Sequence, residues 1–266
     1  MGKIKFLTAN WDNLVMLNYE VDSAVLIPHL PAGTELDLWE GKSLVSIVGF
    51  MFNNTRVLSV KWPGHVNFEE VNLRFYVKYF DGTKWKRGTV FVSEIVPRSI
   101  IPLIANTLYK EHYRKLPMRH SVMAVDSAHT QYLYEWKLNG IWNKLGATVN
   151  NEFATIQPAS AEEFILEHYW GYNRLNDAGS LEYQVEHVPW RIGEVKNYIF
   201  EADIKELCGD AFVPYLIVRP YSVFFAEGSS VNVRGATKLR VNPALPVWPW
   251  PLTGILRTPV RHRHER

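Results

Sequence analysis

The stretch NLRFYVKYF, residues 72–80, constrains the fold most, because it alternates strictly between two kinds of side chain. Read with a period of two, Leu73, Phe75, Val77 and Tyr79 line one face, whereas Asn72, Arg74, Tyr76 and Lys78 line the other. This period predicts a β-strand with one apolar face. The polar face is either solvent-exposed surface or the wall of a site.

Other segments extend the β-rich pattern. Turn signals at 40–42, at Asp81-Gly82 and at Asn139-Gly140 separate strand-like runs and predict hairpins. Helical periodicity predicts helices near 97–114 and 160–172, and Ser160 followed by Glu163 forms a capping box for the second. We therefore predict an α+β fold, mostly antiparallel β.

The domain prediction follows from where these patterns stop. Residues 1–242 contain no repeat and no linker, so we expect one domain over this range. Residues 243–266 are rich in proline and basic, and proline removes backbone donors and fixes φ. We expect this tail to be extended or disordered.

Composition excludes several classes of partner. The 266 residues hold 29 Lys+Arg against 27 Asp+Glu, so no strong field favours nucleic acid or an acidic membrane. The longest apolar run, at 43–52, is far short of the roughly 20 residues of a membrane span. One cysteine, Cys208, allows no internal disulfide, which fits the cytoplasm. A homo-oligomer stays open.

Motifs for bound cofactors are missing from the sequence. It has no G-x-G-x-x-G, no Walker sequence, no H-E-x-x-H, no Cys/His spacing for structural zinc and no G-x-S-x-G. The Ser229-Ser230 pair in EGSSVNV favours a turn or a bend between strands over an activated serine. We expect neither a cofactor nor a metal.

Six strings carry a family resemblance. In order they are FEEVNLRFYV, RGTVFVSEIVPR, LYKEHYRKLPM, EEFILEHYWGY, VEHVPW and AEGSSVNV. They resemble the uncharacterised bacterial YqjF-like family over about Trp11 to Val241. This family is similar to acetoacetate decarboxylase, which implies a barrel or cone of mostly antiparallel strands around a central cavity, with helices outside. The resemblance carries no established activity.

The resemblance also suggests what is missing. Acetoacetate decarboxylase forms a Schiff base through a lysine in a Pro-Lys-Lys string, and here Met118 stands in the corresponding string, KLPM. Arg114-Lys115 is more simply explained by a helix C-terminus and solvent than as a replacement amine. Glu70 matches a carboxylate of that enzyme, and it is the one residue of this sequence to which the resemblance assigns a functional role.

Charge pairing suggests a register for the hairpin of residues 72–96. Placing Arg74 opposite Glu94 also places Glu70 opposite Arg98, so two pairs of opposite charge share one face. An exposed ladder of salt bridges explains the pattern equally well. In a barrel, however, Glu70, Asn72, Arg74 and Tyr76 point inward. An inward guanidinium would bind a small organic anion, and Glu94 would either hold it or compete with the ligand.

The other candidate site residues are aromatic or titratable. His187 in VEHVPW is a candidate acid or base, although packing explains a lone histidine as well. The candidate caps of the cavity are Tyr109, Tyr113, Tyr169, Tyr172 and Trp190, although aromatic residues at helical spacing more often belong to the core.

Two functions are consistent with these residues. The first is an enzyme on a small carboxylate or keto acid, of lyase, hydratase or isomerase type, with Glu70 and His187 in acid/base roles and Arg74 polarising the substrate. The second is a binding module that holds a metabolite without chemistry. A carboxylate with a raised pKa would favour the enzyme.

Overall fold

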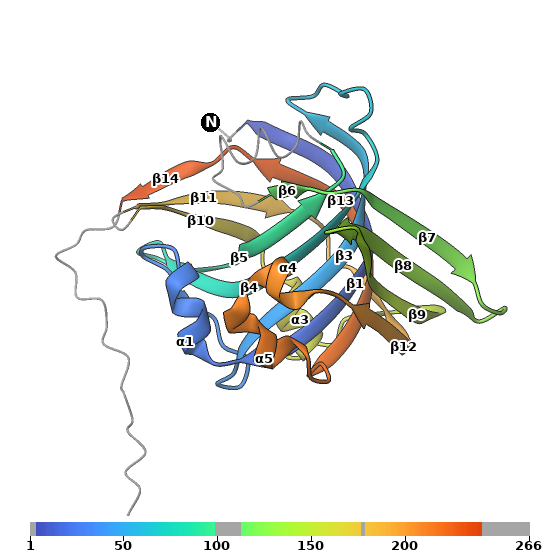
Figure 1. The fold of residues 1–266 in the computed structure, drawn as a ribbon. Coiled ribbons are helices and arrows are strands. Elements are labelled where there is room, and N and C mark those ends of the chain that lie inside the picture. Colours follow the sequence, from blue (N-terminus) through green and yellow to red (C-terminus); the bar gives the residue numbers. More distant parts are fainter. Residues whose placement is uncertain (1–3, 99–112, 177–178, 241–266) are drawn as a thin grey trace, which may run out of the picture.

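A computed structural model describes residues 4–98, 113–176 and 179–240 (Figure 1). Its strands are β1 Lys5–Val21, β2 Glu35–Leu36, β3 Ser43–Val57, β4 Phe68–Phe80, β5 Trp85–Val96, β6 Tyr113–Lys115, β7 Met118–Ala124, β8 His129–Leu138, β9 Ile141–Thr155, β10 Trp170–Asn176, β11 Gly179–Glu186, β12 Arg191–Glu201, β13 Ser222–Arg234 and β14 Thr237–Arg240. Its helices are α1 Ser23–Leu26, α3 Ala161–Leu166, α4 Ile204–Cys208 and α5 Val213–Leu216, with 3₁₀ turns η1 Ile27–His29 and η2 Asp210–Phe212.

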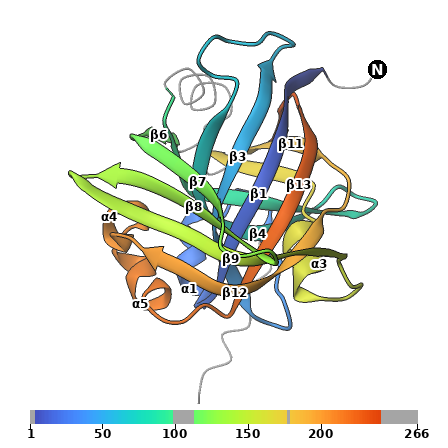
Figure 2. The same cartoon turned by 90° about the vertical axis from the view of Figure 1, so that its right-hand side faces the viewer.

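The strands join in one sheet, in the order β14-β11-β10-β5-β4-β3-β1-β13-β12-β9-β8-β7. The described pairings are antiparallel except β10–β5 and β5–β6. A further pairing joins β11 to β13, so the seven strands β11, β10, β5, β4, β3, β1 and β13 form a closed ring of pairings. Figure 2 shows β3, β1 and β13 side by side. The predicted predominance of antiparallel strands is confirmed.

Strand β4 is buried on both faces, which explains its alternation. Leu73, Phe75 and Val77 pack in a cluster with Tyr134 and Trp136 of β8. The same cluster contains the buried residues of α4, η2 and α5, which are Ile204, Leu207, Phe212 and Leu216. Figure 1 shows α1, α4 and α5 gathered on one side of the sheet. The opposite face of β4 contributes Phe68 and Tyr76 to a second buried cluster.

Both predicted helices need correction. Tyr113 and Arg114 belong to β6, so the helix predicted near 97–114 does not extend to its predicted end, and residues 99–112 lie outside the described residues. The second helix, α3, ends at Leu166 rather than near 172. Residues 170–172 instead pair with β11, because strand pairing overrides the helical periodicity there. The N-cap bond of the predicted capping box is present, since Ser160 Oγ accepts from the Glu163 amide at 3.2 Å, and the Glu163 side chain accepts from the neighbouring Ala159 amide at 2.6 Å.

Two of the three predicted hairpins are confirmed, whereas at 40–42 only a turn closed by an isolated bridge between Trp39 and Lys42 forms, because β2 pairs with β4 rather than with β3. The tip of the β4–β5 hairpin is Asp81–Lys84, where Asp81 Oδ1 accepts from the amides of Thr83 and Lys84. Asn139 and Gly140 join β8 to β9 with φ of 49° and 85°, as a tight two-residue turn requires. In the described part of the chain, no helix is long and apolar enough to cross a membrane.

Candidate functional site

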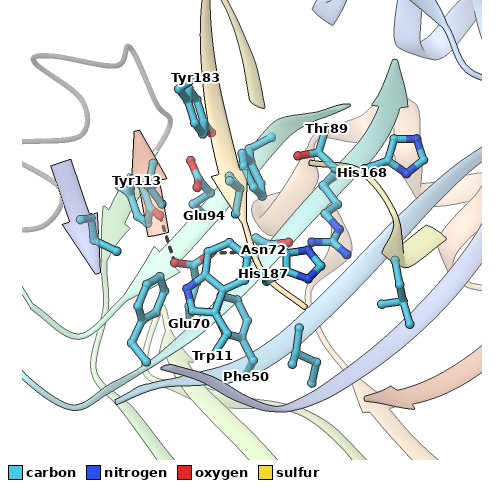
Figure 3. Close-up of a pocket in the computed structure, with 18 of the residues that line it drawn as sticks. Trp11, Phe50, Glu70, Asn72, Thr89, Glu94, Tyr113, His168, Tyr183 and His187 are labelled. Carbon is cyan, nitrogen blue, oxygen red and sulfur yellow. Dashed lines mark hydrogen bonds between the residues drawn. The ribbon is translucent and has the colours of Figure 1, made fainter. Parts of the chain in front are cut away.

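The cavity lies on the face of β4 that carries Glu70, Asn72 and Arg74. It has about 1080 Å³ of empty space, its open mouth included. Figure 3 shows Thr89 and His168 at one end, and Glu70, Tyr113 and Trp11 toward the other. The polar face of β4 is therefore part of a cavity wall rather than exposed surface.

Glu70 is fixed by two neighbours. Asn72 Nδ2 donates to Glu70 Oε1 at 2.8 Å, and the Tyr113 hydroxyl donates to Glu70 Oε2 at 3.0 Å (Figure 3). Only 2 % of Glu70 is exposed. The two bonds hold the carboxyl group in one orientation. Within residues 4–98, 113–176 and 179–240, the buried Oδ1 oxygen of Asn72 has no hydrogen-bond partner.

Arg74 is a charged side chain that is only 7 % exposed. Its Nη2 contacts Met16 Sδ at 3.9 Å, and its buried Nε has no hydrogen-bond partner in the described part of the chain. Among the described residues, no carboxylate forms an ion pair with it. A buried guanidinium without a carboxylate is costly, because neither water nor a counter-charge replaces its hydration. This cost would be relieved by an anionic ligand.

The expected Arg74–Glu94 and Glu70–Arg98 pairs are wrong. A β-bulge puts one extra residue, Val92, between Ser93, which faces Leu73, and Phe91, which faces Arg74. Glu94 therefore lies opposite Asn72. It is 1 % exposed and also lines the cavity. Arg98 lies beyond the end of β5 and is exposed.

His187 lines the cavity, and one of its ring nitrogens is held by a backbone hydrogen bond. Its Nδ1 lies 2.9 Å from the Val188 carbonyl, which can only accept, so Nδ1 carries the proton and Nε2 is the basic atom. Burial lowers the pKa of His187, and the positive charge of Arg74 acts in the same direction. The Trp190 ring stacks on the imidazole at 4.2 Å. His187 is thus an oriented, neutral base beside Arg74.

A second histidine, His168, was missed from the sequence. Its Nε2 donates to Asp37 Oδ2 at 3.2 Å, and Arg87 Nε donates to the same oxygen at 2.6 Å. Burial lowers the pKa of His168 to about 4; Asp37 opposes this shift, whereas Arg87 and Arg74 reinforce it. His168 is therefore neutral near pH 7, and no described residue forms a hydrogen bond with its buried Nδ1.

Of the remaining candidates, some line the cavity and others do not. Tyr113 and Trp190 line the cavity, and Trp190 Nε1 donates to Ser229 Oγ at 2.8 Å. Tyr76 and Tyr169 are not among the described lining residues: the Tyr76 hydroxyl bonds to Ser46, and the Tyr169 hydroxyl donates to Glu167.

Met118 and Tyr109 complete the list of candidates. Met118 begins β7, opposite Trp136, and packs against the cluster on the other face of β4. It is not among the described residues that line the cavity. Tyr109 lies outside the described residues.

Comparison with known families assigns the chain to one of them. A family model described as "Uncharacterized conserved protein", DUF2071, matches residues 8–230. The chain belongs to the DUF2071 family. A relative, "Uncharacterized protein YqjF" of Bacillus subtilis (strain 168), is 31% identical over 111 residues. The match covers 41% of this chain and 44% of that protein, less than half of its length.

Solved structures show that this DUF2071 member has the acetoacetate decarboxylase-like fold. The enduracididine biosynthesis enzyme MppR, complexed with pyruvate, matches with a TM-score of 0.61 and 15% identity, covering 87% of this chain and 90% of that one. Acetoacetate decarboxylase from Legionella pneumophila matches with a TM-score of 0.58 and 13% identity, covering 88% and 87%. An acetoacetate decarboxylase-like enzyme from Sphingomonas wittichii RW1 gives 0.59 and 13%, covering 89% and 93%.

Proposed function

We propose that this protein is an enzyme that acts on a small organic acid inside a barrel cavity, in a lyase, hydratase or isomerase reaction, without a Schiff-base lysine. The observation that carries the proposal is the buried Arg74 guanidinium, which lines the cavity and has no carboxylate partner among the described residues. A ligand carboxylate would supply the missing acceptors in bidentate geometry. The complex of MppR with pyruvate supports this ligand class.

The chemistry follows from the neighbours of Arg74. Once a carboxylate is anchored there, the Nε2 atom of His187 is available to remove or return a proton on the ligand. The neutral state of His187 suits it to act as a base near pH 7. The fixed Glu70 carboxylate supplies a second acid/base group on the same wall. Together they form one guanidinium anchor and two proton-handling groups.

Lysine chemistry is disfavoured by the positions of the lysines. No lysine is among the described residues that line the cavity, and Lys115 is exposed. Lys110 falls outside the described residues. Borohydride with a keto acid should therefore leave the mass of the protein unchanged. A covalent adduct on any lysine would overturn the proposed mechanism.

Binding tests the anchor directly. Calorimetric titration with pyruvate should give a dissociation constant that rises about 10- to 100-fold in Arg74→Lys, because an ammonium group cannot reproduce the two-donor fork. Arg119→Lys is the matched control, since Arg119 pairs with Glu135 on β8 and is not among the lining residues. Equal losses in the two variants, or no binding of any acid, would contradict the anchor.

Proton exchange separates the enzyme from the alternative, a barrel that binds a metabolite without chemistry. The protein in D₂O should catalyse exchange of the methyl protons of pyruvate, followed by NMR, and His187→Gln should abolish exchange while pyruvate still binds. Binding without exchange in the wild-type protein would favour the binding module. Exchange that survives in both His187→Gln and Glu70→Gln would remove these residues from the mechanism.

A further inference from the structure

The cavity continues beyond Glu70 as a wall of apolar side chains. In register, Phe50 lies opposite Glu70, Phe52 opposite Phe68, and Trp11 opposite Phe52. The Trp11 ring meets the Phe50 and Phe52 rings edge-on, at 5.4 Å and 5.7 Å between centroids. We call the six lining residues Leu7, Trp11, Phe50, Phe52, Val57 and Val233 the apolar section.

The far end of the apolar section is formed by one set of cross-strand neighbours. Leu7 of β1 lies opposite both Val57 of β3 and Val233 of β13, and all three line the cavity. These strands are adjacent in the sheet, so the three side chains lie at the same level of the wall. A substitution at Leu7 therefore changes the part of the section that lies farthest from the anchor.

The register also gives the distance from the anchor to this section. Arg74 Nη2 contacts Met16, which lies opposite Val48 and so at the level of Asn72. Trp11 lies opposite Phe52, four residues along β3 from Val48. At the rise of an extended strand, this separation is about 13 Å, whereas Phe50, the nearest member of the section, lies two residues from Val48, or about 7 Å. An acid of three or four carbons held at Arg74 would therefore leave Trp11, Phe52 and the residues beyond them uncovered.

We infer that the ligand is an organic acid with an alkyl or aryl tail, whose carboxylate binds Arg74 and whose tail fills the apolar section. The inference rests on the proposed function and narrows its substrate class. Filling the section removes apolar surface of both ligand and protein from water, and each added methylene group then increases affinity. An acid without a tail would leave aromatic rings of the cavity facing water.

A homologous series tests the tail. Calorimetry with pyruvate, 2-oxobutanoate, 2-oxohexanoate, 2-oxooctanoate and phenylpyruvate should show the dissociation constant falling about two- to fourfold per added methylene group until the section is full. Octan-2-one, which lacks the carboxylate, should bind at least about tenfold more weakly than 2-oxooctanoate.

Two variants on neighbouring residues locate the tail. Leu7→Trp fills the end of the apolar section and should abolish the gain from the longer chains. Thr8→Trp adds the same bulk one residue further along β1, at a position not among the lining residues, and should leave the series unchanged. Circular dichroism spectra of both variants check that they are folded.

The outcomes separate the two proposals. If no acid in the series binds, or the ketone binds as tightly as the acid, the anchor at Arg74 fails. If all acids bind with the same affinity, only the tail is contradicted. A chain-length dependence that is unchanged in Leu7→Trp also contradicts the tail, because the longer chains would then lie elsewhere.

Discussion

His168 combines complete burial with a titratable ring. An ordinary histidine titrates near 6.5, whereas burial lowers the pKa of His168 to about 4, so the unfolded chain takes up this proton first as the pH falls. The contribution of His168 to the free energy of unfolding is therefore complete above about pH 6.5, and it is lost as the pH falls from about 6.5 to 4. Its size is about 3 kcal/mol, from the pKa difference.

The measurement compares urea unfolding of the wild-type protein and His168→Gln at pH 7.5 and pH 4.5. Glutamine can still donate to Asp37 but does not titrate in this range, so the variant should lose clearly less stability on acidification. Asp37 itself is not expected to contribute in this window: burial alone would raise its pKa, but hydrogen bonds from His168 and Arg87 lower it below 3.8. Equal losses would mean that His168 is solvated.

Single residues could be predicted on β4 because its two faces differ in chemistry. Alternation placed Glu70, Asn72 and Arg74 on one face, and these three line the cavity. The partners of Arg74 could not be predicted, because a bulge changes which residue of β5 lies opposite it. Matching charges in the sequence favoured Glu94, although Phe91 is the actual neighbour.

At the level of elements, strand β3 shows why the part of the cavity wall next to β4 was missed. Residues 43–52 are buried on both faces of the sheet, so their apolar run shows no alternation. The periodicity that identified the inward face of β4 is therefore missing from β3. Phe50 and Phe52 became visible as cavity residues only through their register with Glu70 and Phe68.

The outer face of β4 gives the second prediction. Phe75 is fully buried in the cluster that includes Trp136, so Phe75→Ala should destabilise the protein by about 3–5 kcal/mol through lost burial and a cavity. Phe80 ends the same strand and is 47 % exposed, so Phe80→Ala should cost less than about 1 kcal/mol. Chemical denaturation measures both. A small loss for Phe75→Ala would contradict the assignment of the two faces.

Strand β13 depends on a close approach at Gly228. Its φ is 87°, and a Cβ atom there would lie 1.8 Å from the Trp11 carbonyl oxygen. Gly41 also has a positive φ, of 80°, but no heavy atom lies within 4 Å of its would-be Cβ. Gly228→Ala should therefore cost ~1–3 kcal/mol more than Gly41→Ala, since it adds a backbone clash to the same conformational strain. Equal losses in thermal melts would show that the strands separate easily at this point.

At the scale of the whole molecule, the cavity depends on contacts between distant parts of the chain. Leu7 and Val233 are opposite each other on neighbouring strands, and both lie on the cavity wall with Arg74. Local periodicity predicted most strands and turns, because these depend on neighbouring residues. It could not predict that β1 pairs with β13, more than 200 residues later, so Trp11, Phe50 and His168 could not be assigned to one site.

The β11–β13 pairing closes the ring and supplies the last prediction. It rests on two residue pairs, Val185 with Val233 and Glu186 with Asn232, and on an ion pair between Glu186 and Arg234 at 2.9 Å. Opposed residues of antiparallel strands are close enough for a disulfide. In a Cys208→Ser background, Glu186→Cys with Asn232→Cys should oxidise readily and stabilise the protein by roughly 3–4 kcal/mol relative to its reduced form. Comparing two redox states of one variant removes the effect of the lost ion pair.

The control is Gln184→Cys with Asn232→Cys. Gln184 lies opposite Trp170, so the diagonal distance from residue 184 to residue 232 is too long for a disulfide. Equal oxidation of both pairs, or a destabilised bridged form, would mean that β11 and β13 are not held in this register, and that the ring around the cavity is open in solution.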